Sequence, residues 1–212
     1  MEEQLTFQLE DGGSIPTSPL QLSDIFIAVM QKAHANRLFI ENHYAHRAVP
    51  ISECYGAWIK DGRGRKAVGA ISFGKPASYT LCNGICGMEN SSRIYELNRL
   101  WMADCCPRNS ESMFIGRALK FLKEKHPDWI IVSYADSAQG HTGTIYRASN
   151  FFYTGKTKPH LLYDNGSGKH GRHIKCEGEK TYQRSVKHRY VYFFNKNDIS
   201  LLRYPVVKFV DV

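Results

Sequence analysis

Residues 129–151 read WIIVSYADSAQGHTGTIYRASNF, which predicts a strand, a loop and a helix in succession. The nearly continuous apolar run 129–135 is typical of a strand that is covered on both faces. Gly140 and Gly143 mark the loop, and residues 144–150 predict a short helix. Because ligands collect at the carboxyl ends of strands in open α/β sheets, we expect a functional site here.

Two side chains carry the chemistry of this expected site. Asp136 comes directly after the strand, and Tyr146 falls on the helix that follows. A carboxylate and a phenol that converge on one crevice can act as base and acid in a group transfer. The residues leave a structural alternative open, in which Asp136 caps the turn and Tyr146 packs in the core.

The rest of the chain predicts one α/β domain with a mixed sheet and helices on both faces. The predicted strands are 24–30, 53–60, 66–74 and 93–102, the segments FFYTG and HLLYD, and 189–194; the predicted helices are 31–46 and one that begins at Asn109 or Ser110. Residues 75–92 are expected to be irregular. We divide the domain into a lead-in (1–21), a catalytic core (22–155) and a basic C-terminal part (156–212).

The positive charge of the protein is concentrated in one segment. The 212 residues carry a net charge of +8, and residues 156–196 hold ten Lys and Arg against three acids. This distribution favours a polyanion such as DNA as partner, and a solvated basic loop is the alternative. The candidate DNA contacts are Lys169, Arg172, Lys175, Arg184, Lys187 and Arg189.

Composition and the N-terminus argue against export. The sequence has no apolar run of the roughly 18 to 20 residues that a membrane span needs. Glu2 and Glu3 stand where a signal peptide would be positive, so we expect a cytoplasmic protein without a membrane partner. In that compartment the six cysteines are expected to be thiols, and no spacing among them predicts a zinc site.

Three further segments contain candidate site residues. Arg108, Asn109 and Ser110 precede or open a helix, where an anion such as a cofactor phosphate binds readily, although ordinary capping is the commoner cause. The segment Glu41–Arg47 contains two histidines three residues apart, a weak metal-binding pattern. Arg99 interrupts a predicted central strand, and a buried charge there needs a functional or structural partner.

The order of predicted elements resembles the GNAT acyltransferase fold, whose last core helix carries a tyrosine, as residues 145–151 do here. More closely, the sequence resembles the phage Mom family of DNA adenine-modification proteins. The matching segments are ENHYAHR (41–47), GAISFGKPAS (69–78), YELNRLWMAD (95–104), PRNSESMFIGRAL (107–119) and VSYADSAQGHTGTIYRASNFFYTG (132–155). Together they span about half of the chain.

The resemblance implies a transferase that converts adenine in duplex DNA to its N6-carbamoylmethyl form and so protects phage DNA from host restriction. The protein would then act in the cytoplasm of the host cell. By motif, the residues lining the reaction site would be His43, Tyr44, Arg99, Ser112, Asp136 and Tyr146, with Tyr146 as general acid. If an iron route is used, His43, Asp136 and Tyr146 would be its metal ligands.

The cofactor is left open between acetyl-CoA and an iron ion. Pyrophosphate loops of the GNAT fold carry glycines where this chain has Glu111, whose charge would repel a pyrophosphate. Two other functions remain as alternatives: a GNAT acetyltransferase that acts on a small amine or a protein, and a DNA-binding protein without catalytic activity. The oligomeric state is also open, with a homodimer as one candidate.

Overall fold

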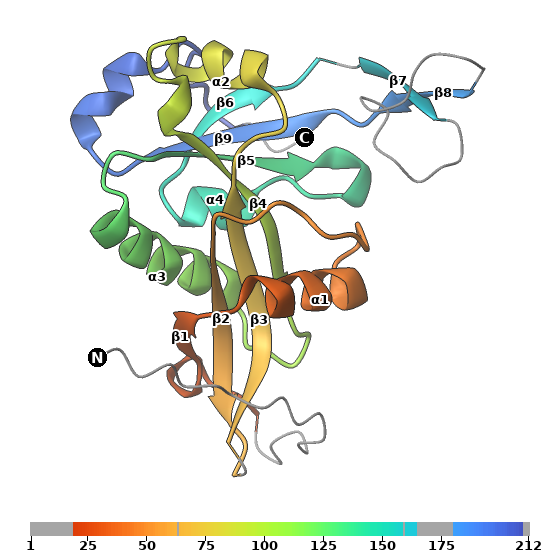
Figure 1. Ribbon diagram of the computed structural model, residues 1–212, viewed down its shortest axis with the longest axis vertical. Helices are drawn as coiled ribbons and strands as arrows, with labels where there is room; N and C mark the ends of the chain where they lie inside the picture. The colour runs from red at the N-terminus through yellow and green to blue at the C-terminus, as the bar shows by residue number, and fades with distance from the viewer. Residues whose placement is uncertain (1–18, 63, 159, 165–179, 210–212) are drawn as a thin grey trace. The chain divides into compact units, whose positions relative to one another are not determined.

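The computed structural model describes residues 19–62, 64–158, 160–164 and 180–209 of the chain (Figure 1). In residues 160–164 and 180–184 it describes the backbone strands only. None of the helices in these ranges is both long and apolar enough to cross a bilayer. All five cysteines that lie in them are free thiols, and Cys54, Cys82 and Cys86 are buried.

The described strands form a mixed seven-stranded sheet in the order β1-β2-β3-β4-β5-β9-β6, together with a separate β7-β8 pair. β4 and β5 are parallel, whereas β9 is antiparallel to both of its neighbours. The strands are β1 (Phe26–Val29), β2 (Glu53–Lys60), β3 (Arg65–Gly74), β4 (Ile94–Met102), β5 (Ile130–Asp136), β6 (Phe152–Lys156), β7 (His160–Asp164), β8 (Lys180–Arg184) and β9 (Lys187–Phe193).

The α-helices are α1 (Lys32–Asn42), α2 (Tyr79–Cys86), α3 (Ser110–Lys125) and α4 (Thr144–Ala148), and short 3-10 turns include η2 (Ser91–Arg93), η3 (Ser137–Gln139) and η5 (Lys196–Leu201). The mixed α/β fold is therefore confirmed. Helix α1 ends earlier than expected because His43 adopts an extended conformation. The prediction of irregular structure over 75–92 is wrong, since Ser78 caps α2 by accepting a hydrogen bond from Leu81 N.

The chain divides into two compact units, and the boundaries between them fall within β3, β4 and α3. The first contains residues up to Ser72 together with Arg99–Ala118, and the second contains Phe73–Asn98 and Leu119–Val212. In the first unit, helix α1 buries Ala35 and Phe39 against the apolar face of β2. This burial removes two apolar side chains from water and fixes the helix on the sheet.

In the second unit, helices pack on both faces of the β5–β9 strand pair. Residues directly opposite each other in this pair share a face of the sheet, and consecutive residues alternate between faces. One face, with Ile130, Val132 and Val191, packs against α2. The other face carries Tyr190, against which Tyr146 of α4 packs. Helices therefore lie on both faces of this part of the sheet, as the sequence predicts.

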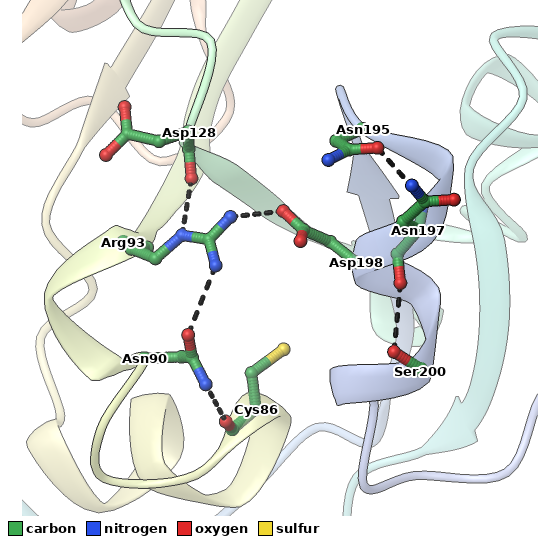
Figure 2. A network of polar contacts seen from close by, with 8 residues as sticks. All are labelled: Cys86, Asn90, Arg93, Asp128, Asn195, Asn197, Asp198 and Ser200. Carbon is green, nitrogen blue, oxygen red and sulfur yellow. Dashed lines mark hydrogen bonds and ion pairs between the residues drawn. The ribbon is translucent and has the colours of Figure 1, made fainter.

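A polar network around Arg93 joins the amino ends of β4 and β5 to η5 (Figure 2). The Arg93 guanidinium donates to the Asp128 carbonyl at 2.8 Å and to Asn90 Oδ1 at 3.1 Å, and it pairs with the Asp198 carboxylate. Three acceptors from three different segments thus meet one planar fork, a geometry for which arginine is well suited.

Replacing Arg93 by alanine is expected to lower the free energy of unfolding by about 2 kcal/mol, because two charge-assisted bonds and one ion pair are lost from a partly exposed site. Urea denaturation measures this change. Arg203→Ala is the matched control, because the Arg203–Glu89 pair is more than half exposed and its loss should cost less than about 0.5 kcal/mol. Equal effects of the two substitutions would contradict the structural role of Arg93.

Candidate functional site

The loop before α4 is fixed by a close contact with Tyr190. Gly143 begins α4 in the left-handed conformation, with φ of 79°. A Cβ at this position would lie 2.3 Å from the Tyr190 ring, so only glycine fits. The Tyr190 hydroxyl donates a hydrogen bond to the Thr142 carbonyl. Tyr190 therefore holds the residues from which α4 starts.

Tyr146 lies within a cluster of aromatic rings. Its side chain is buried, and its ring centroid lies 5.3 Å from that of Tyr190 and 5.5 Å from that of Phe151. Tyr190 in turn contacts Tyr153 of β6 at 5.2 Å. The packing expected in the structural alternative is thus present, and it places the phenol in a low-dielectric environment.

Asp136 is buried at the end of β5 and is held by three hydrogen-bond donors. Its carboxylate accepts from Ala138 N at 3.1 Å, pairs with Lys187 Nζ at 3.1 Å, and accepts a hydrogen bond from Ser185. Burial by itself would raise the pKa of Asp136, but the bonds from Ser185 and Lys187 outweigh it and lower the pKa below its ordinary value. A carboxylate with a lowered pKa is a weak proton acceptor.

The structure does not bring Asp136 and Tyr146 together on one face of the sheet. Asp136 stands opposite Lys187 in the register, whereas Tyr190 stands opposite Ser133. Residues 133 and 136 are three positions apart, so their side chains leave the strand on opposite faces. Tyr146 packs on the face of the sheet that carries Tyr190, so the prediction that the carboxylate and the phenol converge is wrong. The Asp136 carboxylate instead bonds to the turn after β5 and to Lys187 of β9, on the face opposite to Tyr146.

Asp136→Asn is therefore expected to destabilise the fold in a pH-dependent way. The folded pKa lies below the unfolded value of 3.8, so the carboxylate stabilises the fold above about pH 4, and this stabilisation is lost as the pH falls through the folded pKa. We expect a loss of about 2 kcal/mol at pH 7, estimated from charge-assisted hydrogen bonds. Thermal unfolding at pH 7 and pH 3 measures it, and a difference that does not shrink at pH 3 would contradict this role.

Four of the other predicted site residues lie in the first unit. His43 and Tyr44 follow the last turn of α1, and their rings contact each other in a tilted arrangement with centroids 4.2 Å apart. His43 is buried, and its Nδ1 accepts a hydrogen bond from Ala45 N, whereas Tyr44 is exposed. Arg99 is partly buried on β4, and the Ser112 hydroxyl in the first turn of α3 donates to the Asn109 carbonyl.

The amino end of α3 does not suit a pyrophosphate. The Ser110 hydroxyl is buried and donates to the Pro107 carbonyl, so it does not face an incoming anion. Asn109 occupies a left-handed conformation, and the first turn carries the acidic Glu111. These residues do not fit an acyl-CoA phosphate group.

The candidate iron ligands are not gathered into a recognisable metal site. His43 belongs to the first unit, and Asp136 and Tyr146 lie on opposite faces of the second. Within the described ranges, no group of three His, Cys, Asp or Glu side chains has a spacing suited to a metal ion. Because Asp136 and Tyr146 lie on opposite faces of the sheet, they do not fit a shared iron ion.

Two of the candidate DNA contacts, Arg189 and Lys187, are engaged within the protein. The Arg189 guanidinium is buried, donates to Thr154 Oγ1 and to the Thr154 carbonyl at 2.8 Å, and lies over the Tyr204 ring. Arg189 is therefore removed from the candidate DNA contacts, and Lys187 pairs with Asp136. Lys169, Arg172, Lys175 and the side chain of Arg184 lie outside the described residues.

Sequence reasoning missed Tyr190, which contacts Tyr146, and two residues linked to Tyr190, namely Tyr153 and His188. Tyr190 and His188 lie on the same face of β9, and Tyr153 on β6 donates or accepts a hydrogen bond with His188 Nδ1 at 3.0 Å. The alternation of His188, Tyr190 and Tyr192 was the available signal, but it does not reveal which strand β9 pairs with.

Solved structures with a similar arrangement are described as acetyltransferases. One, described as a putative acetyltransferase from Salmonella typhimurium, has a TM-score of 0.50 and 10% identity, covering 82% of this chain and 95% of that one. A ribosomal-protein-S5-alanine acetyltransferase from Vibrio fischeri has a TM-score of 0.50 and 8% identity, covering 82% and 94%. The protein therefore has the GNAT acyltransferase fold.

Within that fold, the chain belongs to the Mom protein family, whose model it matches over residues 24–210. A relative is the methylcarbamoylase Mom of Escherichia phage Mu, which is 29% identical over 185 residues; the match covers 79% of this chain and 71% of the relative. The predicted family resemblance and the predicted fold are both confirmed.

Proposed function

We propose that the protein is a transferase that converts adenine in duplex DNA to its N6-carbamoylmethyl form. The single observation that supports this most strongly is the match to the Mom family over residues 24–210, together with the relative named a methylcarbamoylase. In the reaction, the adenine N6 forms a bond to the transferred group and loses a proton, while the bond between that group and its donor breaks and the remainder of the donor departs as the leaving group. Since N6 is engaged in base pairing within the duplex, the base must first leave the stack, which costs a few kcal/mol.

Tyr146 is the proposed general acid. Its phenol is held in a buried ring cluster, and Tyr190 fixes the start of its helix. A general acid must present its proton from a fixed position, and the ring contacts with Tyr190 and Phe151 fix the Tyr146 side chain. Asp136 is assigned a positioning role, because Lys187 and Ser185 already occupy its carboxylate.

His43, Tyr44, Arg99 and Ser112, which belong to the first unit, are proposed as further functional residues of the protein. Tyr44 is the most accessible of them, with 47% of its surface exposed. An exposed aromatic ring beside a buried histidine is suited to contact with nucleic acid. The basic segment 156–196, which includes the exposed Lys156 and Lys158, is proposed to hold the DNA backbone by its phosphates.

Mass spectrometry of nucleosides from the DNA of cells that express the protein tests the proposal. The expected result is N6-carbamoylmethyl-deoxyadenosine in addition to deoxyadenosine. DNA from cells that carry the empty vector is the control. Unmodified deoxyadenosine alone, in cells that contain the soluble protein, would reject the proposed function.

A further inference from the structure

The ring of Phe209 fills a slot formed by three side chains from three elements. The Cζ atom of Arg147 (α4) lies 3.8 Å from the Phe209 ring centroid. The ring of Tyr153 (β6) meets Phe209 edge-on with centroids 5.0 Å apart, and the His188 ring (β9) lies at 5.4 Å. These three residues form what we call the ring slot.

The walls of the ring slot have the chemistry of a nucleobase site. Proteins hold an unstacked base between aromatic side chains and the plane of an arginine guanidinium, and the ring slot offers both. The Tyr153 hydroxyl and His188 Nδ1 share a hydrogen bond at 3.0 Å, and the rings of both residues contact Phe209. The Phe209 side chain has no polar atom that could hydrogen-bond to Tyr153 or His188, whereas adenine has a hydrogen-bond donor and an acceptor along one edge.

The protonation state of His188 suits a neutral ligand. Its side chain is buried, and burial lowers the pKa of His188, to which the charges of Lys156 and Arg147 add. The imidazole is therefore neutral at pH 7 and keeps one donor and one acceptor nitrogen. A neutral purine with mixed hydrogen-bonding edges matches this set better than an anion or a cation does.

The ring slot is next to the proposed general acid. Arg147 follows Tyr146 directly in α4, and Tyr190 contacts both Tyr146, at 5.3 Å, and Tyr153, at 5.2 Å. All of these residues belong to the second unit. A ligand in the slot is thus bordered by the cluster that contains Tyr146.

We propose that the ring slot receives the adenine that leaves the duplex, and that Phe209 occupies the slot until the base displaces it. The proposal rests on the proposed function and assigns the place of its substrate. The segment that carries Phe209 is suited to displacement: Val206, Val207 and Lys208 are exposed, and Val207 N donates one hydrogen bond to the Tyr153 carbonyl.

Binding of the full chain to duplexes that contain one unpaired adenine tests the proposal, with fluorescence anisotropy as the readout. An unpaired thymine in the same sequence is the reference, because it separates base recognition from backbone binding. Phe209→Ala is expected to raise the preference for unpaired adenine over unpaired thymine about tenfold, since no ring competes for the slot. Val206→Ala, at an exposed neighbouring position, is the matched control and should leave the preference unchanged.

A second variant tests the contribution of the Arg147 guanidinium to the ring slot. Arg147→Lys keeps the charge but removes the planar guanidinium, and it is expected to abolish the gain when combined with Phe209→Ala. An unchanged preference in Phe209→Ala, in a protein that still modifies DNA, would overturn the ring slot and leave the proposed function standing. A chain that neither binds nor modifies DNA would overturn both.

Discussion

Replacing Gly143 by alanine is expected to lower the free energy of unfolding by about 3 kcal/mol and the melting temperature by about 10 °C. Two costs add here. An alanine in the left-handed conformation costs about 1 to 2 kcal/mol, and the new Cβ would lie 2.3 Å from the fully buried Tyr190 ring. Overpacking of this kind costs about 1 to 3 kcal/mol. Calorimetry of the purified variant measures the sum.

Gly140→Ala is the matched control for this effect. Gly140 has a φ of 68°, and no atom lies within 4 Å of the position its Cβ would take. Only the conformational cost remains, so the expected loss is about 1 kcal/mol. Similar losses in the two variants would show that the contact with Tyr190 contributes nothing.

Tyr146→Phe is expected to lower the yield of modified nucleoside at least about 100-fold, the range in which loss of a general acid falls. The ring contacts with Tyr190 and Phe151 remain, so the melting temperature should change by no more than a few degrees. Nucleoside mass spectrometry and calorimetry on the same preparation measure both quantities. A large drop in stability would instead favour a structural role for the hydroxyl.

Tyr190→Phe provides a test of how the acid is positioned. The substitution removes the bond to the Thr142 carbonyl but keeps the ring. If Tyr190 acts through Tyr146, the double variant Tyr146→Phe/Tyr190→Phe should be no less active than Tyr146→Phe alone. The reason is that both substitutions remove the same function, the proton donation by Tyr146. Tyr192→Phe, at the next position on the same face of β9, is the control. If the activity losses of Tyr146→Phe and Tyr190→Phe multiply in the double variant, the two residues act independently and the coupling is contradicted.

Local sequence patterns were sufficient to predict most helices and strands, and helix α2 shows where they failed. Its apolar positions Leu81, Cys82, Ile85 and Cys86 have helical spacing. The segment is short and contains Gly84, which lowers helix propensity, so the pattern did not stand out. The helix is stabilised by tertiary packing against the sheet, which a local pattern does not reveal.

The candidate site could be predicted only as a region of the chain. The sequence correctly placed Asp136 at the end of a strand and Tyr146 on the following helix. It did not determine that they lie on opposite faces, because that depends on the register of β5 with β9, more than 50 residues away. For the same reason Arg189 resembled a surface charge, although its strand lies between two others and buries it.

The position of β9 also constrains how the polypeptide reaches its native state. β6 hydrogen-bonds to β9, although β6 comes first in the sequence and is synthesised first. β6 therefore cannot join the sheet until β9 has paired with β5. Such long-range pairing is slow, and until it forms, β5 presents an unprotected edge to other copies. Truncation before residue 187 should therefore yield inclusion bodies rather than a smaller soluble enzyme.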